Sequence, residues 1–171
     1  MTIITIDPTG TNITGIFIYF GGLVFDFATY QSEKWTWHHN FISLLVKKRK
    51  PQLVIYEDNI KIKTSKGFIN NHYRDLLKSI GGIELILETE KIPSKIIYSS
   101  FTKYANEEAE KGNIGGLARI KKVRVEGTET RGAKKKVWNF KGQEIDEHQK
   151  DALLLFWIYW TKMAKKEWPW L

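Results

Sequence analysis

The sequence contains no cysteine. This absence excludes disulfide bonds, thiolate zinc sites and cysteine nucleophiles, so carboxylate, imidazole or carbonyl groups must hold any bound metal. Such donors favour a hard ion such as magnesium or manganese. The chain also lacks an apolar run of the ~18 residues that a membrane span needs, and it lacks the basic and apolar pattern of a signal peptide at its start. We therefore expect a cytoplasmic protein without a membrane partner.

Acidic residues are outnumbered by basic ones. The 27 lysines and arginines against 19 aspartates and glutamates give a formal net charge of +8. This excess makes a polyanion, and nucleic acid above all, the first partner to consider. The 171 residues, of which 42% are hydrophobic, are enough for one domain with a real core. No repeat or low-complexity linker marks a second domain, so we expect a single domain over 1–171.

Apolar and β-branched runs alternate with helical patterns along the first half of the chain. They predict three opening strands over 2–6, 13–20 and 23–30, a helix over 32–46 that ends at basic residues and Pro51, and a strand over 52–56. After these they predict a helix over 67–79 closed by two glycines, a strand over 83–87 and a short helix over 101–111. This order predicts an α/β fold, a mixed sheet with helices packed on it.

The second half of the chain has a weaker pattern until its last helix. Basic residues crowd 119–136 around two glycines, which predicts an arm or long loop lying on nucleic acid, although a solvated surface insertion is the alternative. The final helix is expected over 144–163. Its apolar residues lie almost all the way round, so it should be buried on more than one side.

Potential metal ligands stand where these elements begin or end. Asp7 follows the first strand, Glu57 follows the strand over 52–56, and His148 and Asp151 share one face of the last helix. A carboxylate at the end of a hydrophobic element is costly unless something neutralises it, and a divalent cation does so. Taken singly, each could be structural: a turn aspartate, a surface strand end or a charge that favours the helix dipole.

Together the four residues suit phosphodiester hydrolysis. In that chemistry two magnesium ions about 4 Å apart activate water and stabilise the leaving oxygen during in-line displacement. Asp7 would bridge both ions and Glu57 would bind one of them. His148 and Asp151 would bind from the helix, and His148 could instead position the nucleophile.

The order of these residues resembles the RuvC family of Holliday-junction resolvases. The family pattern is an aspartate ending the first strand of a meander, a glutamate ending a later strand, and a last helix with His-x-x-Asp or Asp-x-x-Asp before Ala-Leu. The matching segments are Thr5-Ile6-Asp7-Pro8 with Thr14-Gly15, Pro51-Gln52-Leu53-Val54-Ile55-Tyr56-Glu57, and His148-Gln149-Lys150-Asp151-Ala152-Leu153.

The resemblance implies a ribonuclease H-like fold, in which helices flank a mixed five-stranded sheet. It also implies a homodimer that resolves four-way or other branched DNA by paired nicks, with two Mg²⁺ ions in each active site and Mn²⁺ able to substitute. The catalytic and metal-binding residues would be Asp7, Glu57, His148 and Asp151, with Asp146 or Glu147 left open as a substitute for His148. A bacterial cell or a phage-infected host would be the setting, with chromosomal and phage origins both open.

The middle of the chain departs from the family. RuvC proteins have a compact basic segment, loosely Gly-x-Ala-x-Lys, after the fifth strand; the similar segment here starts at Gly132, after an apparent insertion over about 99–130. A basic arm or insertion is therefore expected at about 99–140. An aromatic residue after the catalytic glutamate helps to open the junction in the family, and Phe68 stands near that place, with Tyr73 as the alternative. The residues expected to contact DNA are Lys61, Lys63, Lys66, Phe68, Arg131, Lys134, Lys135 and Lys136, with Arg119, Lys121, Lys122 and Arg124 as further candidates for phosphate contacts.

Three other functions stay open at this point. One is a nuclease of the same fold that acts on RNA or RNA–DNA hybrids, because such enzymes share the carboxylate geometry. Another is a non-catalytic nucleic-acid-binding protein in which the acidic residues are structural. The third is a small domain that binds another protein through Trp168 and Trp170, although packing or a dimer contact suits tryptophan there better.

Overall fold

The first three strands form an antiparallel meander. They are β1 (Ile3–Asp7), β2 (Asn12–Gly21) and β3 (Val24–Ser32), which confirms the three opening strands expected from the sequence. The structure, a computed structural model, describes residues 1–58, 71–124 and 134–170, with side chains described for all of these except 71–72, 121–124 and 134–136.

Two parallel strands complete the main sheet. β4 (Leu53–Asp58) pairs with β1, and β5 (Ser94–Tyr98) pairs with β4. The strand order is β3-β2-β1-β4-β5, so the predicted mixed five-stranded sheet is confirmed. β1 lies at its centre, between an antiparallel and a parallel neighbour.

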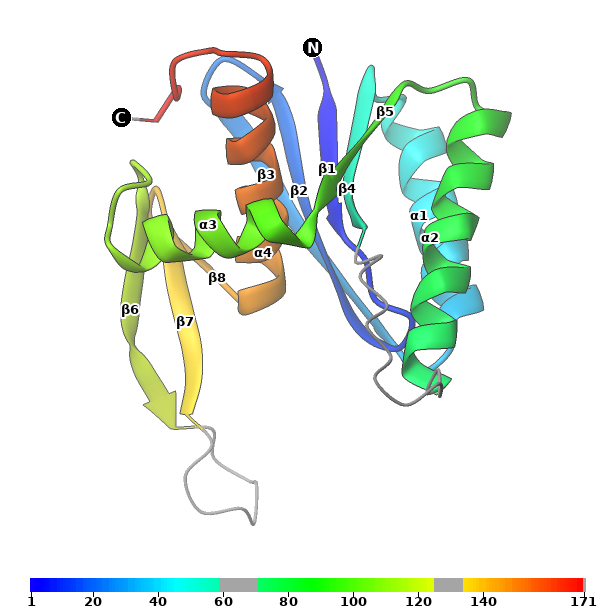
Figure 1. The fold of residues 1–171 in the computed structure, drawn as a ribbon, viewed down its shortest axis with the longest axis horizontal. Helices are drawn as coiled ribbons and strands as arrows, with labels where there is room; N and C mark the ends of the chain where they lie inside the picture. Colours follow the sequence, from blue (N-terminus) through cyan, green and yellow to red (C-terminus); the bar gives the residue numbers. More distant parts are fainter. Residues whose placement is uncertain (59–70, 125–133, 171) are drawn as a thin grey trace.

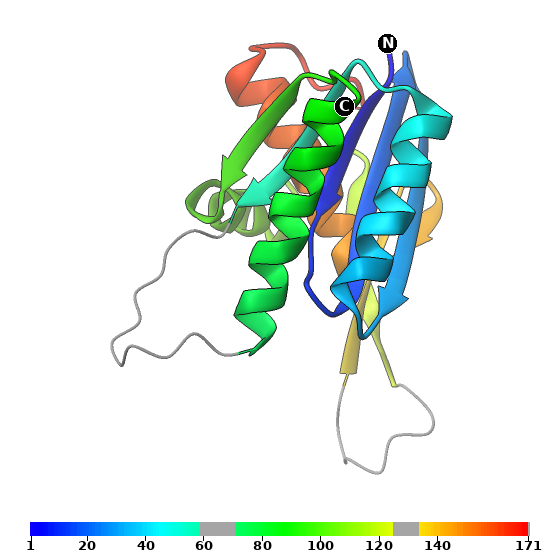
Figure 2. The ribbon, with the colours of Figure 1, turned by 90° about the vertical axis from the view of Figure 1, so that its right-hand side faces the viewer.

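Alternate residues of the central strands face opposite sides of the sheet. On one side, α1 (Trp35–Arg49) and α2 (Asn71–Thr89) lie next to each other across the strands, as Figure 2 shows. The even-numbered residues of β1, β2 and β4 pack against these two helices: Ile4, Ile6, Ile16, Ile18, Val54 and Tyr56.

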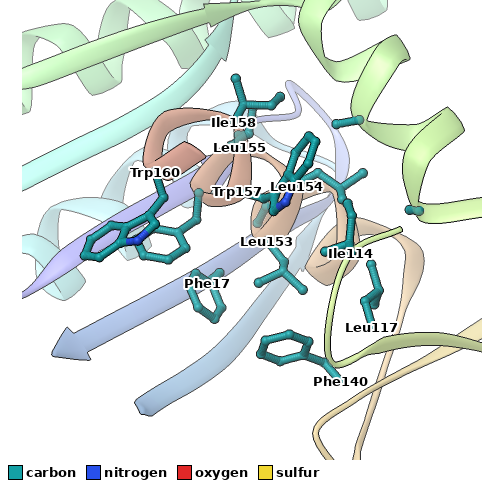
Figure 3. Packing of buried hydrophobic residues seen from close by; sticks show 14 of the residues in the cluster. Phe17, Ile114, Leu117, Phe140, Leu153, Leu154, Leu155, Trp157, Ile158 and Trp160 are labelled. Atoms are coloured by element: carbon teal, nitrogen blue, oxygen red, sulfur yellow. The ribbon is translucent and has the colours of Figure 1, made fainter. Parts of the chain in front are cut away.

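The odd-numbered residues of the same strands face α4 (Glu147–Ile158), which crosses the other side of the sheet. This helix is buried on nearly every side, as its sequence predicted. Figure 3 shows its apolar residues packed among Phe17 of β2, Phe140 and the segment that holds Ile114 and Leu117. The helix continues as a π-helical turn, η1 (Tyr159–Met163), and the C-terminal tail folds back so that Trp168 and Trp170 enter this core. Both tryptophans are buried, so they offer no exposed surface to a protein partner.

A second, three-stranded sheet follows α3 (Ser99–Glu110), the short helix expected over 101–111. It consists of β6 (Leu117–Arg124), β7 (Lys134–Phe140) and β8 (Gln143–Ile145). Figure 1 shows the β6–β7 hairpin projecting from the body of the molecule. Within the described residues, the basic segment expected as an arm or loop forms the paired strands β6 and β7. The last helix begins at Glu147, later than expected, because 143–145 pairs with β7 instead.

The helix closed by Gly81 and Gly82 and the strand over 83–87 were wrong predictions. α2 runs through both glycines to Thr89, and the fifth strand is 94–98. Ile80, Ile83 and Leu87 recur at helical spacing and are buried against the sheet, so packing decides the conformation. A Cβ on Gly82 would lie 2.7 Å from the His39 ring of α1, so this glycine serves close helix packing. No helix in the described part of the chain is long and apolar enough to cross a membrane.

The two adjacent glycines provide a test of this helix. Nothing lies within 4 Å of a Cβ added at Gly81, so Gly81→Ala should raise the free energy of unfolding by about 0.5–1 kcal/mol through its helix propensity. Gly82→Ala carries the same propensity gain but must displace His39, and we expect it to be less stable than Gly81→Ala. Urea denaturation of both variants measures the difference. A loss of stability in Gly81→Ala would indicate that the helix ends at this glycine.

Candidate active site

Strand geometry places Asp7 and Glu57 side by side. The parallel register pairs Ile6 of β1 with Tyr56 of β4, so the two acidic residues follow at neighbouring positions. Both are odd-numbered and extend the face of Thr5 and Ile55, which is the face that α4 covers. Two neighbouring strands therefore bring a carboxylate each to the same edge of the sheet and to the same side of it.

Two contacts with the backbone of α4 hold this helix over Asp7 and Glu57. Thr5 Oγ1 donates a hydrogen bond to the carbonyl oxygen of Ala152 at 2.6 Å. A Cβ added at Gly15, which pairs with Asp7 across the β1–β2 ladder, would lie 2.0 Å from the carbonyl oxygen of His148. Only glycine permits this approach, because any side chain would push the helix off the strand. The first turn of α4 thus lies directly beside the end of β1.

His148 of α4 contacts Asp7 of β1. Its Nδ1 lies 3.1 Å from Asp7 Oδ2. The helix start is held by a capping box, in which the Asp146 carboxylate accepts from the Gln149 backbone and the Gln149 side chain accepts from the Asp146 backbone. Asp146 is therefore engaged as the helix cap, and of the three candidates at this position it is His148 that meets Asp7.

Helix α3 supplies two residues that the sequence did not single out. Thr102 Oγ1 donates to Glu57 Oε1 at 2.9 Å, and Asn106 Nδ2 donates to Asp151 Oδ1 at 3.4 Å. Both lie on the face of α3 turned towards α4, one helical turn apart. The short helix thus holds one carboxylate from the sheet and one from α4.

Lys150 lies almost completely buried among these groups, with 1% of its surface exposed. Its Nζ is 2.6 Å from Glu147 Oε1, 2.9 Å from Asp151 Oδ1 and 2.5 Å from Asn106 Oδ1. It also lies 5.3 Å from the centre of the Trp138 ring, whose Nε1 donates to Glu147 Oε2. Lys150 lies within the polar run Glu147–Asp151, so no sequence pattern distinguished it from a solvated lysine of the first helical turn.

Burial and mutual repulsion govern the charges of the site. Burial is the main cause that raises the pKa of Glu57 to about 7, and the negative charges of Asp7, Asp151 and Asp58 add to it against the Thr102 hydrogen bond. The pKa of Asp7 is also raised, first by burial, while its bond to His148 opposes the rise. The same bond raises the pKa of His148. The carboxylates are therefore close enough to destabilise each other's ionised forms.

The chemistry of these donors fits a divalent cation. Asp7, Glu57 and Asp151 offer carboxylate oxygens and His148 an imidazole, and a cation would offset the burial and repulsion that disfavour their ionised forms. Among the residues that the structure describes, no group of three or more acidic or histidine side chains is gathered as a ready set of metal ligands. Hydrogen bonds from His148 and Thr102, and an ion pair with Lys150 of α4, already engage one oxygen of each carboxylate.

The residues expected to contact DNA fall mostly outside this description. Lys61, Lys63, Lys66, Phe68 and Arg131 lie outside the described residues, and Lys134, Lys135 and Lys136 are described only as backbone of β7. The same holds for Lys121, Lys122 and Arg124 on β6. Arg119 of that strand forms an ion pair with Glu110 at 2.6 Å.

Tyr73, the alternative to Phe68, lies near the start of α2. It lines an open pocket of about 610 Å³ together with the turn that follows Asp7, including Pro8 and Gly10. The pocket therefore adjoins the end of β1. Figure 1 shows that α2, which carries Tyr73, and the β6–β7 hairpin lie on opposite sides of the main sheet's central strands.

Comparison with solved structures assigns the fold. Thermus thermophilus RuvC aligns with a TM-score of 0.57 and 14% identity over 96% of this chain and 97% of that one. The chain has the RuvC fold. T. thermophilus RuvC in complex with a Holliday junction substrate aligns with a TM-score of 0.56 and 13% identity over 91% and 89% of the two chains. No protein-family model matches the sequence, and no curated protein is significantly similar to it. The fold implied by the RuvC resemblance is thus confirmed.

The raised pKa of Glu57 predicts a pH-dependent stability of the metal-free protein. An acid whose pKa is raised by folding costs no stability while protonated, and its cost grows as the pH rises from its ordinary value of 4.5 to about 7. Glu57→Gln removes this cost and keeps an acceptor for Thr102. We expect it to raise the free energy of unfolding by about 1–3 kcal/mol at about pH 8 and by much less at about pH 5.

Urea denaturation in the presence of a chelator measures this effect. Glu107→Gln, which changes an exposed carboxyl group of α3, is the matched control. Equal shifts of the two variants, or a Glu57→Gln shift that does not depend on pH, would contradict the proposed cost of burying the Glu57 charge.

Proposed function

We propose that this protein is a magnesium-dependent endonuclease that cleaves branched DNA, four-way junctions above all. The observation that carries the proposal is the contact of His148 with Asp7 at one edge of a sheet with the RuvC fold, with Glu57 and Asp151 near enough for the carboxylate charges to act on one another. Asp7, Glu57 and Asp151 would hold the metal, with Mn²⁺ able to replace Mg²⁺. Bound metal would supply an activated water and would neutralise charge developing on the phosphate oxygens.

The chain's own residues prepare the site for this reaction. Asp7 engages Nδ1 of His148, which fixes the imidazole and leaves Nε2 as the atom that can contact a water or a phosphate oxygen. Thr102 and Asn106 hold Glu57 and Asp151 from α3. Two helices, α3 and α4, thus orient the carboxylates before substrate arrives, which is the requirement for electrostatic stabilisation of a transition state.

The substrate class rests on charge and on shape. The net charge of +8 suits a polyanion, and β7 begins with three consecutive lysines. In Figure 1 the β6–β7 hairpin extends beyond the edge of the main sheet at which β1 and β4 end. DNA bound along this hairpin would reach the carboxylates at that edge. Because the RuvC structure bound to a Holliday junction shares this fold, a four-way junction is the substrate to test first.

Paired nicks at a four-way junction need two active sites. Each chain provides one set of catalytic residues, so we propose a homodimer as the active form. The junction has approximate two-fold symmetry, which a symmetric dimer can match.

A non-catalytic DNA-binding role is the second candidate. One finding favours it: within the described ranges, no three acidic or histidine side chains lie close enough together to hold a metal ion as they stand. On this view the hydrogen bonds to the carboxylates would be purely structural.

Cleavage of a labelled synthetic four-way junction separates the two candidates. Linear duplex and an RNA–DNA hybrid serve as control substrates, each with magnesium, manganese or a chelator. Paired, metal-dependent nicks confined to the junction are expected. Cleavage of the hybrid alone would assign the protein to a different nuclease class, and junction binding without cleavage in any metal would favour the non-catalytic role.

Asp7→Asn is the sharpest test of the site. The amide keeps the shape of Asp7 but removes an anionic metal ligand, so we expect cleavage to fall on the order of 100-fold or more while junction binding in a chelator is unchanged. Asp26→Asn changes a carboxylate of β3 that pairs with Arg49 away from the site, and it should cleave like the wild type. Full activity in Asp7→Asn would remove Asp7 from the proposed site.

The lysines at the start of β7 are expected to bind phosphates. Replacing Lys134, Lys135 and Lys136 by alanine should weaken junction binding, and each lost phosphate contact should reduce the slope of log K against log salt by about 0.9. A double Lys47→Ala, Lys48→Ala variant at the end of α1 is the control. Binding measured by fluorescence anisotropy over a salt series gives both slopes. Identical slopes for the β7 variant and the wild type would exclude these lysines from the interface.

A further inference from the structure

The buried ammonium group of Lys150 is surrounded by oxygen atoms in the way that a metal ion is. Asn106 Oδ1, Glu147 Oε1 and Asp151 Oδ1 lie 2.5, 2.6 and 2.9 Å from Nζ. These acceptors come from two helices, and two of them are carboxylates. Carboxylate and amide oxygens are also the ligands that hard cations prefer. The three oxygens therefore form a cation cage that a side chain of the protein fills.

This cage differs from the ordinary ion pairs of the molecule. Lys111 and Glu108 approach to 3.0 Å, but 60% of the lysine side chain is exposed, and such surface pairs contribute little. Only 2% of the Lys150 side chain is exposed. A buried charge is tolerated when its hydrogen-bonding capacity is satisfied. Here three acceptors match the three N–H donors of an ammonium group, and the Trp138 ring lies beside it.

The remaining oxygens of the site are enough for a single ion. His148 engages Oδ2 of Asp7, Thr102 engages Oε1 of Glu57, and Lys150 engages Oδ1 of Asp151. Within the described residues this leaves one oxygen on each of the three carboxylates. Magnesium keeps several water ligands and needs only a few protein oxygens. A second ion would have to share these oxygens with the first, bind an oxygen that already accepts a hydrogen bond or ion pair, or displace the lysine.

We propose that the Lys150 ammonium occupies the place of a second cation, so that each site binds one divalent ion instead of the two that the RuvC resemblance implies. The inference rests on the proposed metal-dependent function and specifies how its site is built. Lys150 is a positioning residue: it fixes Asp151 and supplies one of the positive charges that the acidic cluster requires. Truncating its side chain should open the cage to a second ion.

Counting bound Mn²⁺ ions tests the inference without any cleavage assay. Full-length, metal-free protein is titrated with MnCl₂, and bound manganese is measured by calorimetry and by loss of the electron paramagnetic resonance signal of free Mn²⁺. We expect one ion per chain in the wild type and two in Lys150→Ala. Lys150→Met fills the same space without charge and should stay at one ion, and Lys95→Ala, an exposed lysine of β5, is the control for a lost surface charge.

The outcomes separate this inference from the proposed function. Two ions in the wild type would overturn the inference and leave metal-dependent cleavage intact. One ion in a folded Lys150→Ala would also overturn it, because the cage would then be only structural. No ion in the wild type would overturn both proposals. If Lys150→Ala does not fold, the wild-type count decides, with one ion supporting the inference and two refuting it.

Discussion

The close contact between α4 and the β1–β2 ladder is the constraint on which the site depends. Gly15 lets the backbone of His148 lie against β2, and Thr5 ties the next turn of the helix to β1. A helix held at this distance brings its first two turns over the carboxyl end of β1. A side chain at Gly15 would clash with the His148 backbone and would have to move the helix, and with it the imidazole that contacts Asp7. The apolar remainder of α4, buried among the aromatic residues of the core, provides the free energy that holds it there.

That burial is also what makes the acidic cluster costly. Asp7 and Glu57 extend buried strands, and their ionised forms lose hydration and repel each other. The protein offsets part of this cost with its own donors: an imidazole on Asp7, a hydroxyl on Glu57 and an ammonium group on Asp151. Each donor also fixes the orientation of one carboxylate. The same contacts thus lower the cost of the cluster and limit the number of oxygens left for a metal ion.

The core of the site could be predicted from sequence because its signal is local. An acidic residue that ends an apolar strand shares the face of the residues two and four positions before it, and the i, i+3 spacing of His148 and Asp151 places them on one helix face. The partners Thr102 and Asn106 lie about 45 residues from the groups they contact, and no local pattern indicates such pairs.

The wrong prediction at Gly82 has a related cause. In the sequence, a glycine that ends a helix cannot be distinguished from one that allows a neighbouring helix to pack closely, and only the position of His39 shows that Gly82 is of the second kind. The basic segment was likewise interpreted as an arm or loop, although its strand β7 ends in Trp138 and Phe140, both buried.

Trp138 connects the two regions that carry the functional argument. It lies on β7, the strand that begins with the three lysines proposed to bind DNA, and its ring faces the Lys150 ammonium while its Nε1 bonds to Glu147. Glu147 and Lys150 belong to the first turn of the helix that carries His148 and Asp151. Because β7 is joined to this turn by a hydrogen bond and a cation–π contact, a shift of the strand would disturb the carboxylate geometry. DNA bound along the hairpin would therefore be held in a fixed position relative to the metal ligands, as cleavage at a defined phosphate requires.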